Sequence, residues 1–246
     1  MSCLQAQNKF LLSLLVCLTS ISTGYSQKAT AWQWPEGKQA ALSLTFDDAR
    51  QSQVTQGTPL FDSLGVKATF YVVPESMKPV LDGWKLAVQS GHEIGNHSLY
   101  HPCTGNFQWS QDHALEDYTL AQMHSELTDA NQQIEHLLGV KAVSYAYTCG
   151  QKFVGRGNQT RSYIPVVADL FQSGRGFLDE TANAPSYLDL AQLTGIESDG
   201  KDFEEILPIL EQSRENGDWV VSVSYTHLRA HETNLLISYA VFCLKR

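Results

Sequence analysis

Two short stretches of this 246-residue sequence carry side chains that could hold a metal ion. Asp47 and Asp48 are adjacent carboxylates at the end of a β-rich run, and they would repel each other unless a cation or a proton lay between them. His97 and His101 are one helical turn apart, so a helix face or a converging loop would bring both imidazoles together. One Asp and two His ligands leave positions open for water and substrate, which is typical of a catalytic metal site.

Each pair alone also has an ordinary structural explanation. One carboxylate of an Asp–Asp pair can cap the following helix while the other is solvated. A His-x3-His spacing by itself is a weak indication of a metal site. Together the two pairs favour a site, because the carboxylates end a strand, where ligands bind in α/β folds. The other histidines before residue 222 are expected to have structural or surface roles, and they are His92, His113, His124 and His136.

The elements that must position these residues alternate between strands and helices. β-rich runs cover 40–46, 67–73, 142–147 and 218–223, and helical patterns cover 83–91, 114–139 and 202–217. Gly139 and Gly217 are positioned to end the last two helical patterns as C-caps. Such alternation predicts a parallel sheet or barrel of the α/β class.

The length and composition predict one exported domain. A chain with 43% hydrophobic residues and this length can bury one sizeable core. Residues 1–26 resemble a bacterial export signal, with Lys9 before an apolar run that is too short to span a bilayer. Lipid attachment at Cys17 is a weaker alternative, because Val16 is larger than the residue usually preferred there. No other segment resembles a membrane span, so we expect a periplasmic or extracellular protein.

The last 25 residues differ in character from the rest of the chain. Segment 222–246 resembles the translated reading of a sequencing adapter, so we interpret it as a non-native tail and 27–221 as a C-terminally truncated domain. His227 and His231, a second pair with the spacing of the first, are therefore set aside. The alternative is a genuine strand and helix with a second metal pair.

The net charge argues against nucleic acid as a partner. It is −9 for the full chain and becomes −12 without 1–26 and 222–246, because four basic residues and one acidic residue leave with these segments. A domain of this charge would repel a polyanion.

Three segments together resemble the motifs of the polysaccharide deacetylase family, the NodB-homology domain of carbohydrate esterases. They are TFDD at 45–48, HSLYH at 97–101 and YAYTCG at 145–150, and the similarity extends over roughly 40–221. The resemblance implies a deformed (β/α) barrel, here incomplete at its C-terminal end. It also implies a hydrolase that removes acetyl groups from N-acetylated or O-acetylated carbohydrate polymers.

The resemblance further implies roles for individual residues. Asp48, His97 and His101 would bind one divalent metal, usually Zn²⁺, and Asp47 would be the general base. The backbone N–H of Cys149 would stabilise the oxyanion. Both carboxylates are needed, because one binds the metal that acidifies a water and polarises the acetyl carbonyl, while the other takes the water's proton.

The chain departs from the family pattern in three places. Thr148 stands where a proline is usual, which frees φ and adds an N–H to the turn. Ala146 stands where many relatives have an Arg that touches the base. The Leu-x-His motif expected just beyond Val221 is replaced by the adapter-like tail, and His227 cannot safely inherit its role. We therefore expect the chain as written to be impaired in activity and stability.

Several alternatives stay open at this level. The substrate could instead be a cyclic amide or an acetyl ester of plant polysaccharide, or the protein could be a catalytically silent carbohydrate-binding protein. In this fold Cys103 and Cys149 would lie near the metal, either as a disulfide or as free thiols. Tyr100, Phe107 and Trp109 could stack on sugar rings or pack as ordinary apolar side chains.

Overall fold

The computed structural model describes residues 32–225. The expected signal peptide and the part of the expected tail beyond Tyr225 lie outside the described residues, and both assignments remain predictions. Within 32–225, no helix is long and apolar enough to cross a membrane.

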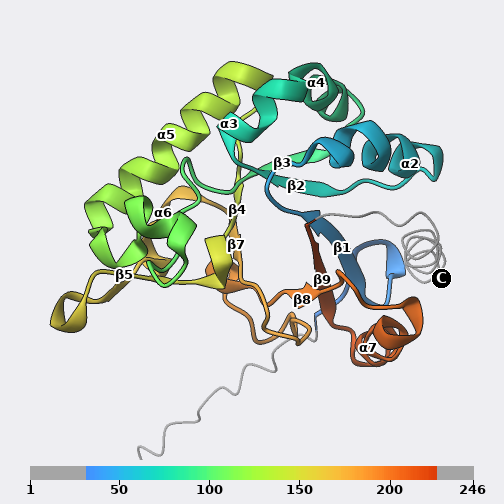
Figure 1. Cartoon of the computed structure of the whole chain (residues 1–246). Coiled ribbons are helices and arrows are strands. Elements are labelled where there is room, and N and C mark those ends of the chain that lie inside the picture. The colour runs from blue at the N-terminus through green and yellow to red at the C-terminus, as the bar shows by residue number, and fades with distance from the viewer. Residues whose placement is uncertain (1–31, 226–246) are drawn as a thin grey trace, which may run out of the picture. The chain divides into compact units, whose positions relative to one another are not determined.

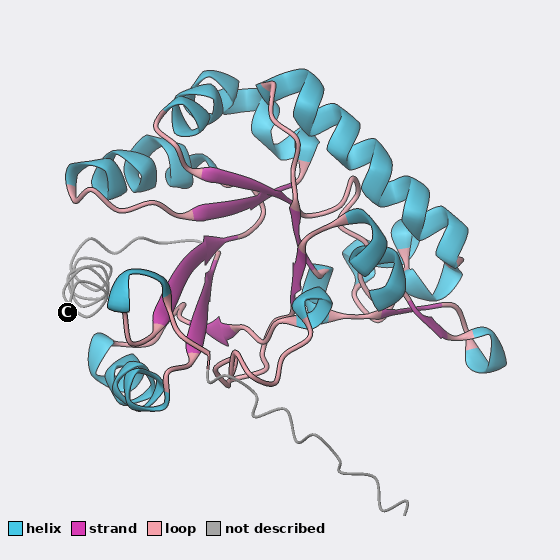
Figure 2. Cartoon of the chain, turned by 180° about the vertical axis from the view of Figure 1, so that it is seen from behind, coloured by secondary structure: helices cyan, strands magenta, loops and turns pink. Residues whose placement is uncertain are grey.

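Seven parallel strands form one curled sheet in the order β7-β4-β3-β2-β1-β9-β8. They are β1 (Ala41–Phe46), β2 (Thr69–Val72), β3 (Glu93–Asn96), β4 (Ser144–Ala146), β7 (Ser173–Arg175), β8 (Ile196–Glu197) and β9 (Trp219–Ser224). Figures 1 and 2 show the sheet curling into an open half-barrel with helices around its outside. The predicted fold class, a deformed (β/α) barrel, is confirmed. A small antiparallel hairpin, β5 (Phe153–Val154) with β6 (Arg161–Ser162), lies apart from this sheet.

Helices fill the connections between the strands. The α-helices in the described range are α2 (Thr58–Ser63), α3 (Pro74–Met77), α4 (Leu81–Gln89), α5 (Leu120–Leu138), α6 (Ile164–Leu170) and α7 (Phe203–Asn216). Shorter helical turns are η1 (Pro35–Gly37), η2 (Gln53–Gly57), η3 (Lys78–Val80), η4 (Gln108–His113), η5 (Leu115–Asp117), η6 (Thr148–Gly150), η7 (Gly157–Gln159) and η8 (Leu190–Gln192). The strands and helices alternate as the sequence pattern predicted.

Helix α5 begins later than the sequence pattern predicted. The pattern placed its start at Ala114, but a capping box formed by Thr119 and Gln122 fixes the first turn at Leu120. Each of these two side chains accepts a hydrogen bond from the other residue's backbone N–H, which satisfies two donors of the first turn. Gly139 ends the helix with a φ of 72°, as predicted.

Two hydrophobic clusters form the core. The larger one joins β1 and β2 to α2, α4 and α7, and the rings of Phe46, Phe61, Phe70 and Trp84 contact one another within it. The smaller one joins α5 and α6 to β4, with Tyr145 fully buried at its centre. Full burial of each large apolar side chain contributes roughly 1.5–3 kcal/mol, so both clusters hold the strand ends firmly in place.

The strand that carries the two aspartates is held by β9, which pairs with β1 along its whole length. The backbone N–H of Asp47 donates to the carbonyl of Ser224 at 3.0 Å, and the Gln53 amide donates to the carbonyl of Asp47 at 2.6 Å. Strand β9 runs three residues past Val221, the expected end of the authentic domain. That boundary itself remains a prediction.

Candidate active site

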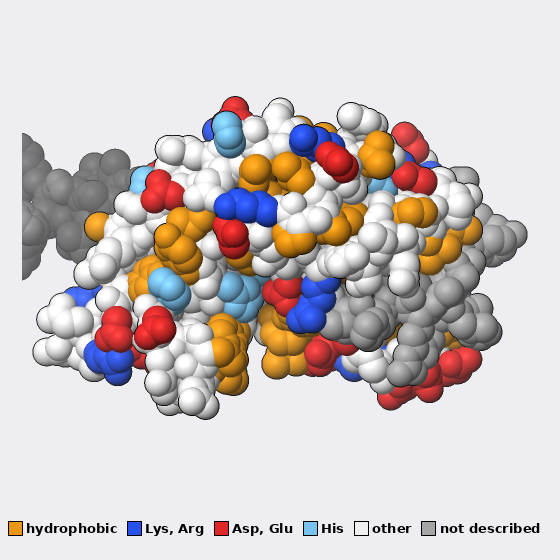
Figure 3. All heavy atoms as spheres, turned by 45° about the horizontal axis from the view of Figure 1, so that its top comes forward, with side chains coloured by type: hydrophobic (Ala, Val, Ile, Leu, Met, Phe, Trp, Pro, Cys, Tyr) orange, Lys and Arg blue, Asp and Glu red, His pale blue; other side chains and the backbone are white. Residues whose placement is uncertain are grey.

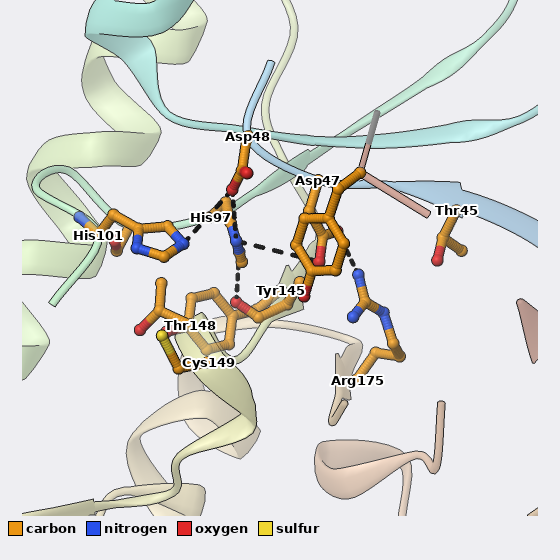
Figure 4. A network of polar contacts seen from close by, with 12 residues as sticks. Thr45, Asp47, Asp48, His97, His101, Tyr145, Thr148, Cys149 and Arg175 are labelled. Atoms are coloured by element: carbon orange, nitrogen blue, oxygen red, sulfur yellow. Dashed lines mark hydrogen bonds and ion pairs between the residues drawn. The ribbon is translucent and has the colours of Figure 1, made fainter. Parts of the chain in front are cut away.

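The predicted site residues converge at the carboxyl ends of the strands (Figure 4). Asp47 and Asp48 directly follow β1, and His97 directly follows β3. Cys149 lies in η6, three residues beyond the end of β4. Because parallel strands end at the same edge of a sheet, separate connections deliver these residues to one place.

Asp48, His97 and His101 form a compact group, the candidate metal group. Asp48 Oδ1 lies 3.5 Å from His97 Nε2 and 3.4 Å from His101 Nε2. One potential ligand atom from each residue lies within 4.8 Å of the other two. His97 is fully buried, whereas about a quarter of the side chains of His101 and Asp48 is exposed. Solvent therefore reaches the group through Asp48 and His101.

The hydrogen bonds of the two histidines leave the same ring nitrogen available in each. His97 Nδ1 lies 2.9 Å from the carbonyl of Ala146, which can only accept, so Nδ1 carries a proton. His101 Nδ1 lies 3.7 Å from Cys103 Sγ, a disulfide sulfur that has no proton to give. Both Nε2 atoms therefore face Asp48, ready to bind a proton or a metal ion.

The negative charges of Asp47 and Asp48 favour a positive charge within the group. Burial alone would lower the pKa of His97, but the charges of Asp47 and Asp48 outweigh it and raise that pKa. Burial would likewise raise the pKa of Asp48, but its contacts with His101 and His97 hold the pKa well below its usual range. The two carboxylates therefore favour positive charge at this place.

A divalent cation fits these residues. His97 Nε2 and Asp47 Oδ2 are buried without a hydrogen-bond partner in the described structure, and leaving such atoms unsatisfied costs about 1–3 kcal/mol each. One carboxylate and two imidazole nitrogens are ligands that Zn²⁺ accepts in catalytic sites, with the remaining positions open. The unsatisfied atoms and the donor set both point to a cation at this place.

Glu126 of α5 holds the loop between the two histidines. Its buried carboxylate accepts hydrogen bonds from the backbone N–H groups of Leu99 at 3.1 Å and Tyr100 at 2.7 Å. The Ser98 hydroxyl in turn accepts the N–H of His101 at 2.9 Å. The loop is therefore fixed from both sides before any ligand binds.

Backbone strain is concentrated at the site. Of the eight non-glycine residues with positive φ in the described range, five lie here, namely Asp48, Ala49, Ser98, His101 and Cys149. This region of φ costs an L-residue about 1 kcal/mol or more. Such conformations persist only where surrounding contacts enforce them, and they are typical of functional sites.

Asp47 is completely buried and paired with Arg175, which sequence reasoning missed. Arg175 Nη2 donates to Asp47 Oδ1, and its Nη1 donates to the carbonyl of Gly176 at 3.0 Å. The guanidinium carbon also lies 4.8 Å from the ring centroid of Tyr71. Burial alone would lower the pKa of Arg175, but the neighbouring Asp47 raises it.

The position of Arg175 explains why it was missed. It ends β7, 128 residues from Asp47 in the sequence, and its register partner in the sheet is Ala146 of β4. The arginine that the family pattern would place at Ala146 is thus supplied from the neighbouring strand. Only the pairing of β4 with β7 reveals this, and no local spacing in the sequence indicates it.

The turn that contains Cys149 is attached to the loop of the metal group. Cys149 forms a disulfide with Cys103, so the disulfide alternative is confirmed. The buried Thr148 hydroxyl donates to the carbonyl of Pro102. These two links join the turn to the residues that directly follow His101, and they replace the rigidity that a proline at 148 would supply.

The other histidines lie outside the group. His92 is buried at the opposite end of β3, where its Nδ1 accepts the N–H of Ala68 at 3.2 Å. His113 stacks on Tyr100, while His124 and His136 are exposed on α5. His227 and His231, which sequence reasoning set aside, lie outside the described residues.

Comparison with known families agrees with this geometry. The family model described as polysaccharide deacetylase matches residues 34–163, a stretch of 130 residues in a chain of 246. The matched stretch contains both aspartates, both histidines and the Cys149 turn. It ends before Arg175.

Individual relatives support the same family. The peptidoglycan-N-acetylglucosamine deacetylase PgdA of Listeria monocytogenes is 41% identical over 64 residues, which are 25% of this chain and 13% of that protein. The chain spans between 6% and 25% of the length of the curated relatives that it matches.

Two solved structures share the fold. The Streptococcus pyogenes deacetylase PplD in complex with acetate has a TM-score of 0.52 at 20% identity, over 68% of this chain and 69% of that chain. A CE4 family pseudoenzyme from Bacillus anthracis has a TM-score of 0.52 at 17% identity, over 85% of this chain and 61% of that chain. The shared fold therefore occurs both with and without activity.

Proposed function

Because this chain belongs to the polysaccharide deacetylase family, we propose that it is a metal-dependent hydrolase that removes acetyl groups from N-acetylated or O-acetylated carbohydrate polymers. Asp48, His97 and His101 would hold one divalent ion, with Zn²⁺ as the first candidate. The observation that carries the proposal is the free oxygen of Asp47 beside this group, since Asp47 Oδ2 lies 4.0 Å from His97 Nε2.

The two aspartates have separate tasks in this mechanism. When bound, the ion would polarise the acetyl carbonyl and lower the pKa of a water. Asp47 Oδ1 is occupied by Arg175, so Oδ2 is the atom that takes the proton of the attacking water. Arg175 fixes the orientation of that carboxylate and balances its charge in a buried place.

The turn after β4 would stabilise the acetyl oxygen as negative charge develops on it. The backbone N–H of Cys149 is the proposed donor, because preorganised N–H groups next to the reacting atoms stabilise an oxyanion without reorganising. The disulfide and the Thr148 hydrogen bond keep this turn beside the metal group.

Replacing Asp47 tests the proposal. Asp47→Asn keeps the shape of the side chain but removes the base, so turnover of acetylated oligosaccharides should fall by roughly 10²–10⁴-fold. Zinc content, measured by elemental analysis, should be unchanged. Asp82→Asn, on the exposed surface of α4, is the matched control. An Asp47→Asn protein as active as its parent would overturn the assignment of the base.

The second candidate is a carbohydrate-binding protein without turnover. The replacement of the usual proline by Thr148 and of the usual arginine by Ala146 favours it, as does the similarity in fold to a pseudoenzyme. A panel of N-acetylated oligosaccharides, acetylated xylan and cyclic amides separates the candidates. Binding of a glycan with no release of acetate or opening of an amide would support the silent protein.

We also propose that the domain at 27–221 is exported. The Cys103–Cys149 disulfide supports this, because such bonds persist in oxidising compartments and are rare in the bacterial cytoplasm. N-terminal sequencing of protein recovered outside the cytoplasm should find a start near residue 27. An uncleaved N-terminus on cytoplasmic protein would contradict it.

A further inference from the structure

Exposed aromatic side chains gather beside the candidate active site. Six aromatic residues are strongly exposed in the described structure, namely Trp32, Tyr100, Phe107, Trp109, Phe153 and Tyr187. Three of these lie between 100 and 109, in the segment that directly follows the proposed metal ligands. Single exposed apolar residues are ordinary, but several in one place mark an interaction surface.

The rings of Phe107 and Trp109 stack on each other, and Trp109 contacts His101 of the metal group. Their rings lie 5.5 Å apart and are inclined by only 17°. The Trp109 ring lies 5.7 Å from the ring of His101, whose side chain is partly exposed. Phe107 is 44% exposed and Trp109 61% exposed. Figure 3 shows a notch in the surface where histidine, acidic and basic side chains meet hydrophobic ones.

The backbone beneath these rings is firmly anchored. Ser110 is buried, and its hydroxyl both donates to the carbonyl of Cys103 and accepts the N–H of Cys103, each at 2.9 Å. The N–H of Thr104 donates to the side chain of Gln151 at 2.7 Å, and the N–H of Phe107 donates to the Thr104 carbonyl at 3.1 Å. The rings are thus held outward on a rigid base, which lowers the entropy lost when a ligand binds.

Tyr100 does not share this surface. Its ring already stacks on His113, at 4.6 Å between centroids and an angle of 5°. Its partner is thus His113, whereas the Phe107–Trp109 stack contacts His101 of the metal group through Trp109.

We propose that Phe107 and Trp109 form a stacking platform for a pyranose ring next to the acetylated sugar, so that the protein selects chains of sugars over single ones. A pyranose has an apolar C–H face that matches an aromatic ring, and polar groups around its rim that stay in water. The negative net charge disfavours polyanionic chains, so the proposed ligand is a neutral acetylated oligosaccharide. The inference rests on the proposed function, since it names part of that substrate.

Calorimetric titration with a tetramer of N-acetylglucosamine tests the platform. The whole zinc-loaded chain carrying Asp47→Asn is used, so that the ligand survives the measurement. Phe107→Ala and Trp109→Ala should each raise the Kd of the tetramer about tenfold, the loss expected for one aromatic stack. Trp109→Phe should recover most of the affinity, and the Kd of the monosaccharide should change less than twofold.

The controls separate this inference from the proposed function. Tyr187→Ala removes a side chain that is 92% exposed and should leave tetramer binding unchanged. Circular dichroism verifies that each variant is folded. If Phe107→Ala and Trp109→Ala both bind the tetramer within twofold of their parent, the platform is wrong, whether or not the unmodified chain releases acetate. Loss of binding in both variants supports the platform even if the chain proves catalytically silent.

Discussion

The two halves of the candidate site are built in different ways. The metal half consists of Asp48, His97 and His101, which follow two strands and come from the motifs TFDD and HSLYH. The other half would orient the proposed base and oxyanion donor, and there the sequence departs from the family pattern at Ala146 and Thr148. Local motifs thus build one half, whereas contacts between distant segments build the other.

The difference shows that a site can keep its geometry while its residues change position. Arg175 lies beside Ala146 on the neighbouring strand of the sheet. A guanidinium from another strand therefore reaches Asp47, which an arginine at position 146 would otherwise contact. A disulfide and a threonine hydroxyl hold the turn at 148–150 where a proline is usual. Departures from a motif therefore do not establish loss of function until the neighbours of the altered residue have been inspected.

Removing the guanidinium should have the largest effect. Arg175→Met leaves the Asp47 carboxylate buried and unpaired, and should lower the free energy of unfolding by about 3–5 kcal/mol in urea titrations. Adding Asp47→Asn to this variant should recover most of the lost free energy of unfolding. Arg156→Met, which breaks an exposed pair with Asp117, is the control and should cost less than about 1 kcal/mol. Equal losses in the two arginine variants would contradict a buried ion pair.

Removing a ligand from the metal half should affect metal binding next most strongly. If the 10–16 kcal/mol of a four-ligand zinc site is shared evenly, one ligand is worth roughly 3–4 kcal/mol, so His97→Ala should weaken zinc binding about 100- to 1,000-fold. Competition with a chromogenic chelator measures this. His124→Ala, on the exposed face of α5, should bind zinc normally. Normal zinc affinity in the His97→Ala protein would remove the basis for the metal group.

Breaking the disulfide should affect the half of the site that contains the Cys149 turn more than the metal half. Cys103→Ser with Cys149→Ser should lower the free energy of unfolding by about 2–4 kcal/mol. Zinc affinity should fall far less than in His97→Ala, while turnover per bound zinc drops, because the oxyanion donor loses its support. Reduction of the unmodified chain should act in the same direction. A reduced protein with unchanged turnover would show that the link does not position the turn.

The smallest effect is expected at the support of the metal loop. Glu126→Gln keeps one oxygen for the N–H groups of Leu99 and Tyr100 but loses the charge, so zinc affinity should fall about tenfold. Glu135→Gln, exposed on the same helix, is the matched control. If both variants bind zinc equally well, the carboxylate of Glu126 does not position the ligands.

Sequence reasoning went furthest where the information is local. The C-caps at Gly139 and Gly217 depend on nearby residues, and the structure confirms them. The two aspartates and two histidines come from local motifs, and the structure brings them together, while their roles remain predictions. The start of α5 was misplaced because a capping box took precedence over the hydrophobic period. Arg175 was missed because strand register, which no single segment contains, brings it to Asp47.

The disulfide between Cys103 and Cys149 also makes the structure of the turn depend on the redox state of the surrounding compartment. A newly made chain in a reducing cytoplasm would lack it, and the turn that contains Cys149 would be held less firmly there. Oxidation after export would complete the turn. The proposed activity would then develop only after the proposed export.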